Sequence, residues 1–266
     1  MFSRRDVLAA SGALVFESQA GLTARLPGMV TPKSVTPTVL ATGGDFPGTP
    51  GRPYFGRMLL SLLAKPDPTI CYIGDAGGDW PEDLASFKQD MSSLPFRIVS
   101  FDIFKPATLN FLDFLMGVDA VFVGGGSTRN LMALWKEWGF DKALVEAWKA
   151  GVVMSGASAG ALCWYETGLT DSYRPTLSSV GGLGILSGSA DVHHEVRPDR
   201  AVKFREMIAD GSLKSPGLAL DETVAAVYRG TRLTELVSVT KEGKASLVVK
   251  TPSGYNERQL PVRYLG

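Results

Sequence analysis

Short apolar runs alternate with amphipathic segments from residue 38 to residue 155 of the 266-residue chain. The apolar runs are short enough to be buried strands; they lie at residues 38–41, 69–73, 96–101, 119–123 and 152–155. The intervening segments space their apolar side chains as one face of a helix does; they lie at residues 54–64, 81–91, 107–116, 128–138 and 141–150. This alternation predicts an α/β fold with a mostly parallel, doubly wound sheet and helices on both faces.

The pattern changes after a predicted helix at residues 199–210. Short strand-like runs then follow one another, with turns at Gly230 and Gly243; they lie at residues 218–220, 224–228, 236–240 and 246–250. We interpret these runs as antiparallel strands toward the C-terminus of a single domain at residues 38–266. Glycine clusters at residues 43–44, 77–78 and 124–126 follow three of the parallel strands, at the end of the sheet where ligands bind in such folds.

The N-terminus carries paired arginines, Arg4 and Arg5, ahead of an apolar run at residues 7–16 that is too short to span a bilayer. Small residues at Ser18 and Ala20 fit the positions that a signal peptidase reads. Residues 1–20 therefore resemble a twin-arginine export signal cleaved after Ala20, followed by a Pro- and Thr-rich linker at residues 21–37. We expect an exported, periplasmic protein. The alternative is a cytoplasmic protein with a frayed N-terminal helix.

The charges of the chain balance, with 27 basic and 27 acidic residues, so no electrostatic footprint indicates nucleic acid or a membrane surface. We expect a small peptide substrate as the partner, no nucleic acid, and no membrane contact after signal removal; the oligomeric state is left open between monomer and homodimer. Both cysteines, Cys71 and Cys163, lie in apolar runs, which predicts two buried free thiols.

The segment at residues 151–164 joins a buried strand to a helix through small residues on both sides of Ser158. Such neighbours, Gly156 and Gly160, let a chain bend sharply and expose the serine hydroxyl, as in a nucleophile elbow. The N–H of Ala159, at the positive end of the helix, then points to where an oxyanion would form. The alternative is an ordinary packing turn between a strand and a helix.

A serine nucleophile needs a base, and His193 and His194 are the only histidines of the chain. The strand character of residues 188–194 predicts that these two side chains point to opposite faces, so only one can reach Ser158 and a shared metal is unfavourable. The acidic member that orients the histidine is expected from a loop at residues 166–172, which contains Asp171 and Glu166.

A second glycine-rich turn, at residues 124–127, runs from a predicted strand into a predicted helix. It lacks the lysine and spacing of a phosphate-binding loop, so we interpret it as the source of a second oxyanion donor, the N–H of Gly125 or Gly126. Arginines near these motifs are candidates to bind a substrate carboxylate, with surface solvation as the alternative; they are Arg129, Arg174, Arg197 and Arg200.

Together, these motifs resemble the peptidase E and cyanophycinase family of serine peptidases, peptidase family S51. The resemblance spans about residues 38–230 and rests on the order of the segments at 124–128, 156–161, 170–172, 192–194 and 218–222. One departure is Ser127, which stands where the family usually has asparagine.

The resemblance implies a fold like that of class I glutamine amidotransferases and a cofactor-free, metal-free site. Ser158 would be the nucleophile, His193 the base, and Asp171, in preference to Glu166, the acid. Gly125 and Ala159 would donate to the oxyanion, and Arg129 and Arg197 remain candidates for substrate binding. It further implies hydrolysis of small peptides, with aspartyl dipeptides or β-linked aspartyl peptides as candidates. The alternatives are a non-catalytic small-ligand-binding module and an esterase or transferase with the same triad.

The export signal predicts a measurable change of location. Replacing Arg4 and Arg5 by lysine should trap the full-length protein in the cytoplasm, because the twin-arginine pathway reads the arginine pair. N-terminal sequencing of the wild-type protein from its native host should find a new terminus near Gly21. Unprocessed Met1 in the soluble cytoplasmic fraction would contradict the prediction.

Overall fold

The computed structural model describes residues 36–44, 48–49, 52–173 and 175–266. The predicted signal at residues 1–20 and residues 21–35 of the predicted linker lie outside the described residues. Residues Val35–Gly266 form one compact unit. Its described strands form an eight-stranded sheet, a six-stranded sheet and one short pair, β2 (Gly48–Thr49) with β3 (Arg52–Pro53).

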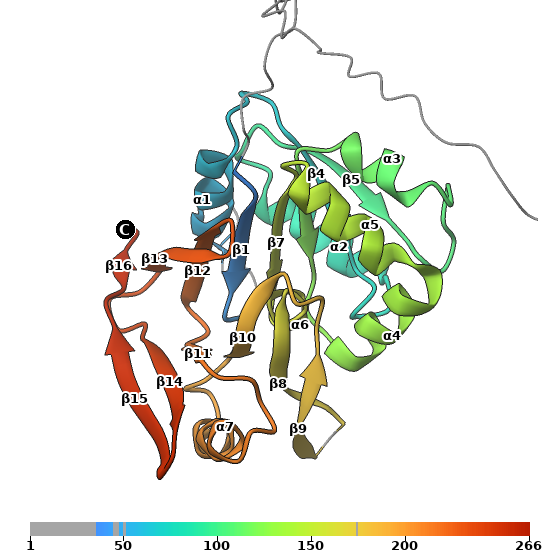
Figure 1. The fold of residues 1–266 in the computed structure, drawn as a ribbon. Helices are drawn as coiled ribbons and strands as arrows, with labels where there is room; N and C mark the ends of the chain where they lie inside the picture. The colour runs from blue at the N-terminus through green and yellow to red at the C-terminus, as the bar shows by residue number, and fades with distance from the viewer. Residues whose placement is uncertain (1–35, 45–47, 50–51, 174) are drawn as a thin grey trace, which may run out of the picture. The chain divides into compact units, whose positions relative to one another are not determined.

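The eight-stranded sheet has the strand order β16-β13-β12-β1-β7-β6-β4-β5 (Figure 1). The five strands from β1 to β5 in this order are mutually parallel, whereas β12 runs antiparallel to both β1 and β13. The predicted α/β class is therefore confirmed, including antiparallel strands from the C-terminal part of the chain. The strands are β1 (Thr38–Thr42), β4 (Thr69–Ile73), β5 (Arg97–Phe101), β6 (Ala120–Val123), β7 (Val153–Ala157), β12 (Val224–Arg229), β13 (Arg232–Ser238) and β16 (Arg263–Tyr264).

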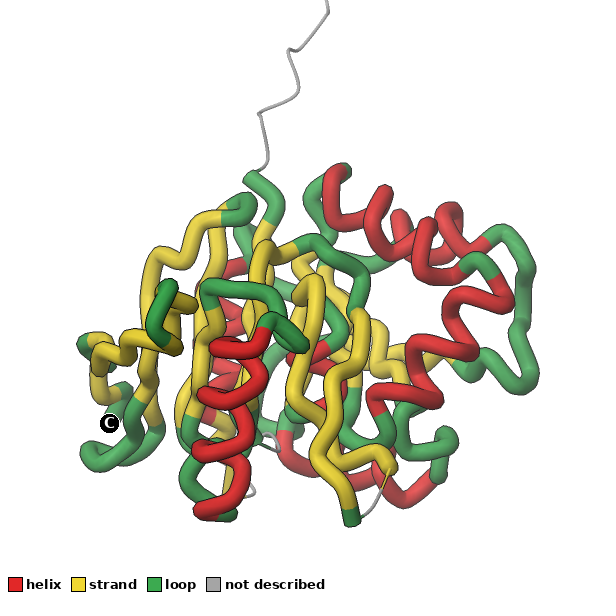
Figure 2. The backbone as a smooth tube through the Cα atoms, turned by 60° about the horizontal axis from the view of Figure 1, so that its bottom comes forward, coloured by secondary structure: helices red, strands yellow, loops and turns green. Residues whose placement is uncertain are grey.

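Helices cover both faces of this sheet, as the tube in Figure 2 also shows. Strand residues alternate between two apolar clusters: Leu40 of β1 packs with α1 and α2, and its neighbours Val39 and Ala41 pack with α3, α4 and α5. Burial on both faces explains the short apolar runs of the four inner parallel strands, β1, β4, β6 and β7. The helices are α1 (Tyr54–Leu62), α2 (Pro81–Asp90), α3 (Phe111–Met116), α4 (Thr128–Trp138) and α5 (Phe140–Lys149).

Local capping sets where two of these helices begin. The Ser127 side chain accepts a hydrogen bond from the Asn130 N–H at 3.2 Å, so Ser127 is the N-cap of α4. Asn110 accepts from the Asp113 N–H in the same way, and α3 therefore starts at Phe111 rather than at the predicted residue 107.

After the elbow the chain builds a second sheet, with the order β15-β14-β11-β10-β8-β9. The predicted antiparallel strands toward the C-terminus are divided between the two sheets. The prediction of a loop at residues 166–172 was wrong, because these residues belong to strand β8. The physical reason is Leu169, which is fully buried in a separate core with Phe204 and Ile208 of α7. The remaining elements are β8 (Tyr165–Tyr173), β9 (Thr176–Gly181), β10 (Leu186–Asp191), β11 (Gly217–Leu220), β14 (Ala245–Thr251), β15 (Gly254–Leu260), α6 (Ala159–Leu162) and α7 (Pro198–Asp210).

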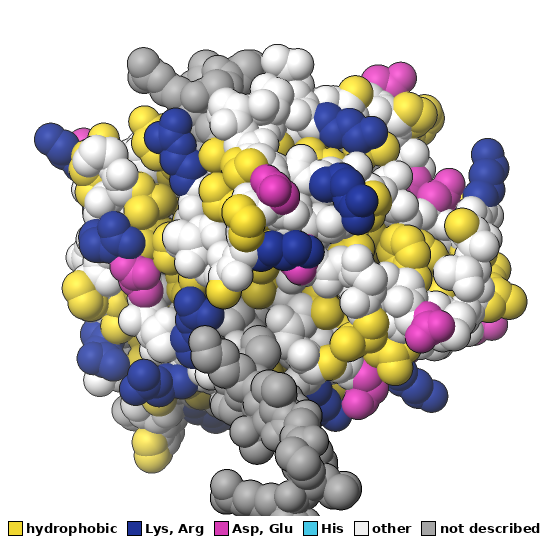
Figure 3. Space-filling view, turned by 90° about the horizontal axis from the view of Figure 1, so that it is seen from above, with side chains coloured by type: hydrophobic (Ala, Val, Ile, Leu, Met, Phe, Trp, Pro, Cys, Tyr) yellow, Lys and Arg dark blue, Asp and Glu magenta, His cyan; other side chains and the backbone are white. Residues whose placement is uncertain are grey.

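Both cysteines, Cys71 and Cys163, are buried free thiols, as predicted. Burial raises the pKa of both thiols, which disfavours a thiolate nucleophile. Figure 3 shows one face of the molecule, on which Lys and Arg side chains are interspersed with Asp and Glu and no histidine is visible. Within the described ranges, no helix has the length and hydropathy of a membrane span.

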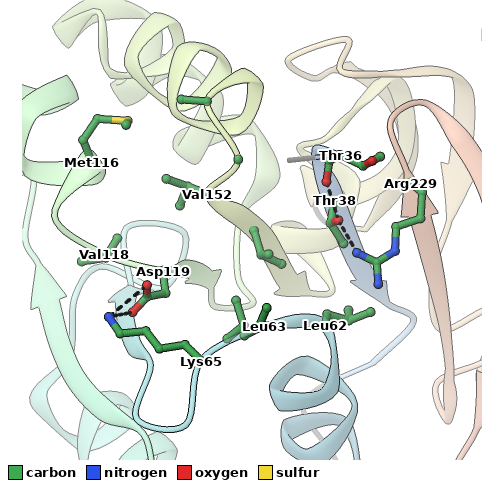
Figure 4. A pocket seen from close by; sticks show the side chains of 14 residues that line it. Thr36, Thr38, Leu62, Leu63, Lys65, Met116, Val118, Asp119, Val152 and Arg229 are labelled. Atoms are coloured by element: carbon green, nitrogen blue, oxygen red, sulfur yellow. Dashed lines mark hydrogen bonds and ion pairs between the residues drawn. The ribbon is translucent and has the colours of Figure 1, made fainter. Parts of the chain in front are cut away.

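A cavity of about 460 Å³ opens at the amino ends of the parallel strands (Figure 4). Its polar groups pair with one another: Lys65 bonds to Asp119 at 2.9 Å, and Arg229 donates to the Thr38 hydroxyl at 2.9 Å. Ligands of doubly wound sheets bind at the opposite, carboxyl ends of the strands. The predicted site residues lie at that opposite end.

Candidate active site

Ser158 lies in the tight turn between β7 and α6. Its φ of 55° and ψ of −113° are unfavourable for a residue that carries a side chain. The residue is partly exposed, whereas its neighbours Ala157 and Ala159 are buried. The predicted strand-to-helix turn is thus present, and it presents the hydroxyl at the carboxyl end of the sheet.

Glycines on either side of Ser158 allow this turn to form. A Cβ at Gly160 would overlap the Val123 carbonyl at the end of β6, and a Cβ at Gly156 would overlap the Gly160 carbonyl. All of these obstacles are backbone atoms, which cannot rotate away. The two glycines are therefore required by close backbone approach.

His193 contacts both of its expected types of partner. Its Nε2 lies 2.9 Å from the Ser158 Oγ, and its Nδ1 lies 3.1 Å from the Glu222 Oε1. If Nδ1 carries the proton and donates it to the carboxylate, Nε2 is left free to accept the serine proton. The His193 side chain is 24% exposed and that of Glu222 is 47% exposed, so the group is open to a substrate from solvent.

Short backbone contacts position the histidine and the carboxylate. The His193 N–H donates to the Gly43 carbonyl at 2.9 Å, just beyond β1. Gly44 lies against the Glu222 side chain so closely that a Cβ there would overlap it. The Glu222 N–H in turn donates to both oxygens of Glu195, at 2.9 and 3.0 Å. The predicted glycine cluster at residues 43–44 therefore contacts both residues: Gly43 accepts a hydrogen bond from the His193 backbone, and Gly44 packs closely against the Glu222 side chain.

The expectation that Asp171 or Glu166 orients the histidine needs correction, because Glu222 faces His193 Nδ1 in the described structure. Both predicted residues belong to strand β8. Asp171 lies 3.8 Å from Arg197, and Glu166 accepts a hydrogen bond from the Gly188 N–H at 2.6 Å.

Glu222 belongs to the connection between β11 and β12. Its segment, residues 218–222, contributes to the family resemblance, but the sequence alone did not assign it a role. The signal that could have found it is a carboxylate directly after a buried apolar strand, at the carboxyl end of that strand.

His194 has a different environment from that of His193. Its Nδ1 lies 2.7 Å from Asp191, and the same carboxylate pairs with the buried Arg200 at 2.7 Å. The two histidines do point to different partners, but they follow strand β10 in a turn, in which His193 has a φ of 54°, and do not form part of the strand. Arg200 is 4% exposed, which removes it from the candidates for substrate binding.

Two backbone N–H groups follow the ends of the neighbouring strands β6 and β7. Among the described residues, neither the N–H of Gly125 nor that of Ala159 donates a hydrogen bond. Unpaired N–H groups at the end of a strand and at the start of a helix are suitable donors for a developing negative charge. The availability of these two groups is compatible with the predicted oxyanion donors.

The remaining candidate arginines differ in their surroundings. Arg129, in the first turn of α4, donates to the Ser178 hydroxyl and the Ser179 carbonyl at 3.3 Å each. Arg197 pairs closely with Asp199 and more loosely with Asp171. Arg174 lies outside the described residues. Among the described residues, the hydrogen-bond acceptors of the Arg129 side chain are therefore neutral, whereas Arg197 already has carboxylate partners.

Carboxyl groups gather on the side of the site that holds the histidine. Asp221, next to Glu222, is 8% exposed; burial raises its pKa, the Lys244 N–H lowers it, and the charge of Glu195 raises it. Of the residues that the structure describes, no group of three or more His, Cys, Asp or Glu is arranged to hold a metal ion.

The sequence model of peptidase family S51 matches residues 38–236, which include Ser158, His193 and Glu222. The chain belongs to peptidase family S51. It is thereby a serine peptidase, and it is similar to the uncharacterised peptidase YgaJ of Bacillus subtilis (strain 168). The two are 38% identical over 224 residues, which cover 84% of this chain and 96% of that protein.

Two solved structures have folds similar to that of this S51 peptidase. A peptidase from an acI-B1 actinobacterium superimposes with a TM-score of 0.64 at 20% identity, covering 86% of this chain and 96% of the other. A candidate peptidase E of Listeria monocytogenes EGD-e gives a TM-score of 0.59 at 17% identity, covering 77% and 100%.

The geometry predicts which carboxylate matters for turnover. Glu222→Gln should reduce kcat by about 10²- to 10⁴-fold, because an amide no longer stabilises the imidazolium or fixes the proton on Nδ1. Asp171→Asn, which also removes one partly exposed carboxylate, is the matched control and should change kcat less than about tenfold. Steady-state kinetics on one substrate decides between them. A larger loss in the Asp171 variant would restore Asp171 as the orienting acid.

The two histidines should also differ in the kind of damage that their loss causes. His193→Ala should lower kcat by about 10⁴-fold or more, because Ser158 loses its base. His194→Ala should instead lower the melting temperature, because Asp191 loses a buried hydrogen bond worth about 1 kcal/mol. Kinetics and calorimetry on both variants test the distinction. An equal loss of kcat in both would exclude His193 as the sole base.

Proposed function

We propose that this S51 peptidase hydrolyses small peptides through an acyl-enzyme on Ser158, with His193 as general base and Glu222 as its orienting acid. The observation that carries the proposal is the chain of contacts from Ser158 Oγ to His193 Nε2 and from Nδ1 to Glu222, at 2.9 and 3.1 Å. A serine, an imidazole and a carboxylate in hydrogen-bonding series are the parts that acyl transfer needs.

In the first half of the reaction, Ser158 Oγ attacks the peptide carbonyl carbon while its proton moves to His193 Nε2. The carbonyl π electrons move to the oxygen, which becomes an oxyanion that the N–H groups of Gly125 and Ala159 stabilise. The carbon–nitrogen bond then breaks, and His193 gives its proton to the leaving amine. The products of this half are a free amine and an ester on Ser158.

In the second half, a water molecule takes the place of the amine. The water oxygen attacks the ester carbonyl while His193 Nε2 accepts a proton from the water. The N–H groups of Gly125 and Ala159 stabilise the second oxyanion. When the ester bond breaks, the proton returns to Ser158 Oγ and the carboxylic acid leaves. Glu222 stabilises the imidazolium in both halves and ends unchanged.

A substrate with an acidic residue is the favoured class within this proposal. Support comes from the resemblance to peptidase E and cyanophycinase, and from Arg129, which follows the glycine-rich turn of Gly125 directly. Its contacts are neutral oxygens at 3.3 Å, which a substrate carboxylate can displace in favour of a charge-assisted pair. Aspartyl dipeptides and β-linked aspartyl peptides are therefore the first candidates.

The export proposed from Arg4 and Arg5 would bring the enzyme to peptides outside the cytoplasm. Both arginines lie outside the described residues, so this part of the proposal rests on the sequence alone.

Covalent labelling tests the nucleophile whatever the substrate is. A serine-reactive aryl phosphonate should label the wild-type protein at Ser158 and leave Ser158→Ala unlabelled, as read by intact mass and peptide mapping. Because this variant removes only one hydroxyl, its melting temperature should stay close to that of the wild type. Failure of the folded wild-type protein to react would favour a non-catalytic binding module.

Substrate profiling tests the reaction itself. Wild-type protein should release amino acids from a dipeptide panel, and Ser158→Ala should lower turnover on the order of a millionfold. Matched pairs that differ only in aspartate against asparagine, and in α- against β-linkage, measure the preference for an acidic residue. Equal turnover within each pair would remove the aspartyl preference, and cleavage of esters without peptides would make the protein an esterase.

A further inference from the structure

Two carboxyl groups with unpartnered oxygens lie in the turn at residues 74–79, beyond the end of β4. Asp75 is 2% exposed and accepts a hydrogen bond from the Trp135 indole N–H at 2.6 Å. Asp79 is partly buried and accepts one from the Gly74 N–H at 3.1 Å. The proposed reaction uses neither residue.

Each carboxyl keeps one buried oxygen without a donor among the described residues, Asp75 Oδ1 and Asp79 Oδ2. Both side chains belong to the same short turn, and burial and the charge of Asp75 raise the pKa of Asp79. One proton shared between them supplies the missing donor, whereas two buried carboxylates at this separation would repel. The geometry thus favours a pair that holds one proton.

The surroundings place that proton on Asp79. Burial raises the pKa of Asp75, whereas the hydrogen bond from the Trp135 N–H lowers it and so favours the ionised form. Burial, the hydrogen bond with Asp75 and the charges of Asp75 and Asp102 raise the pKa of Asp79 to about 8. The other titratable groups near the pair and its turn come from β4, α2 and α4; they are Cys71, Asp83 and Glu137.

The same turn supports the glycine-rich turn at residues 124–127. The Ser127 N–H donates to the Ala76 carbonyl at 2.8 Å, and the Gly124 N–H donates to the Ile73 carbonyl at 2.9 Å. Gly126 has a φ of 136° and lies so close to Ala76 that a Cβ would overlap its carbonyl. A movement of the turn that contains Asp75 and Asp79 would therefore displace the backbone of the glycine-rich turn, including Gly125.

We propose that Asp75 and Asp79 are positioning residues for the Gly125 oxyanion donor, and that turnover falls when the proton shared between them is lost at alkaline pH. The inference rests on the function proposed for Gly125. A second negative charge below this turn would also oppose the oxyanion that forms above it.

The direction of the pH effect follows from the raised pKa of Asp79. A carboxyl whose pKa is raised by folding contributes stability that is fully present below its ordinary value of about 4. That contribution is lost as the pH rises through the folded value of about 8. The protonated Asp79 thus stabilises the turn at neutral pH, and this stabilisation is lost at alkaline pH.

The decisive variant is Asp79→Asn. Asparagine accepts the positive φ of 55° at this position, can accept from the Gly74 N–H, and donates to Asp75 at any pH. In the wild type, kcat should fall about tenfold or more between about pH 7 and about pH 9.5, as expected when an oxyanion donor is misplaced. In Asp79→Asn that fall should be absent. Asp79→Ala, which supplies neither bond, is the control and should be impaired at both pH values.

A second measurement follows the pair without any turnover. The Trp135 indole N–H signal, assigned by its loss in Trp135→Phe, should titrate near pH 8 in the wild type, together with the amide signals of Gly125 and Ser127. It should be constant in Asp79→Asn. An indole signal that does not titrate between about pH 6 and about pH 10 would overturn the proposal.

The rate of phosphonate labelling of Ser158 separates this proposal from the proposed function. An alkaline fall in the labelling rate of the wild type that Asp79→Asn abolishes supports the positioning role. Normal labelling with an unchanged alkaline profile in Asp79→Asn overturns the positioning role and leaves the nucleophile assignment intact. Absence of labelling at every pH contradicts the proposed function, while the indole titration still reports the state of the pair.

Discussion

Three backbone segments meet beneath Ser158 at distances that leave no room for a side chain. Gly160 lies against the carbonyl of Val123, and Gly156 lies against the carbonyl of Gly160. A residue with the backbone angles of Ser158 carries strain of about 1–3 kcal/mol, which persists only where the surrounding structure prevents relaxation. The close approach of Gly160 to the Val123 carbonyl prevents the backbone of Ser158 from relaxing. Because Val123 is also the last residue of β6, the same approach determines where the turn that contains Gly125 begins.

Charge is distributed unequally around this contact. Carboxylates of Glu195, Asp221 and Glu222 lie on the histidine side, where a positive imidazolium would form. On the opposite side, the proposed single proton keeps the pair of Asp75 and Asp79 at one negative charge instead of two. In the proposed mechanism, the protein thus places carboxyl groups near the developing cation and limits negative charge at the turn that supports the oxyanion donor.

Much of this arrangement follows from local sequence, and the exceptions have physical causes. The parallel strands, the turn at Ser158 and the contact with a histidine were predictable, because continuous apolar runs, small residues and a chain with two histidines leave few choices. Glu222 was missed because the acid was sought close to the elbow in the sequence. Whether residues 166–172 form a loop or a strand depends on the burial of Leu169 against α7, a long-range contact that no local pattern encodes. The division into two sheets was missed for the same reason.

The position of Glu222 has a consequence for how the enzyme tolerates change. The residue lies between β11, which belongs to the six-stranded sheet, and β12, which belongs to the eight-stranded sheet. Ser158 follows a strand of the larger sheet and His193 follows a strand of the smaller one. A residue inserted into or deleted from the β11–β12 connection would displace the carboxylate from His193, and the series of contacts to Ser158 would be broken. At this connection the length of the chain, as much as its chemistry, determines whether the three groups meet.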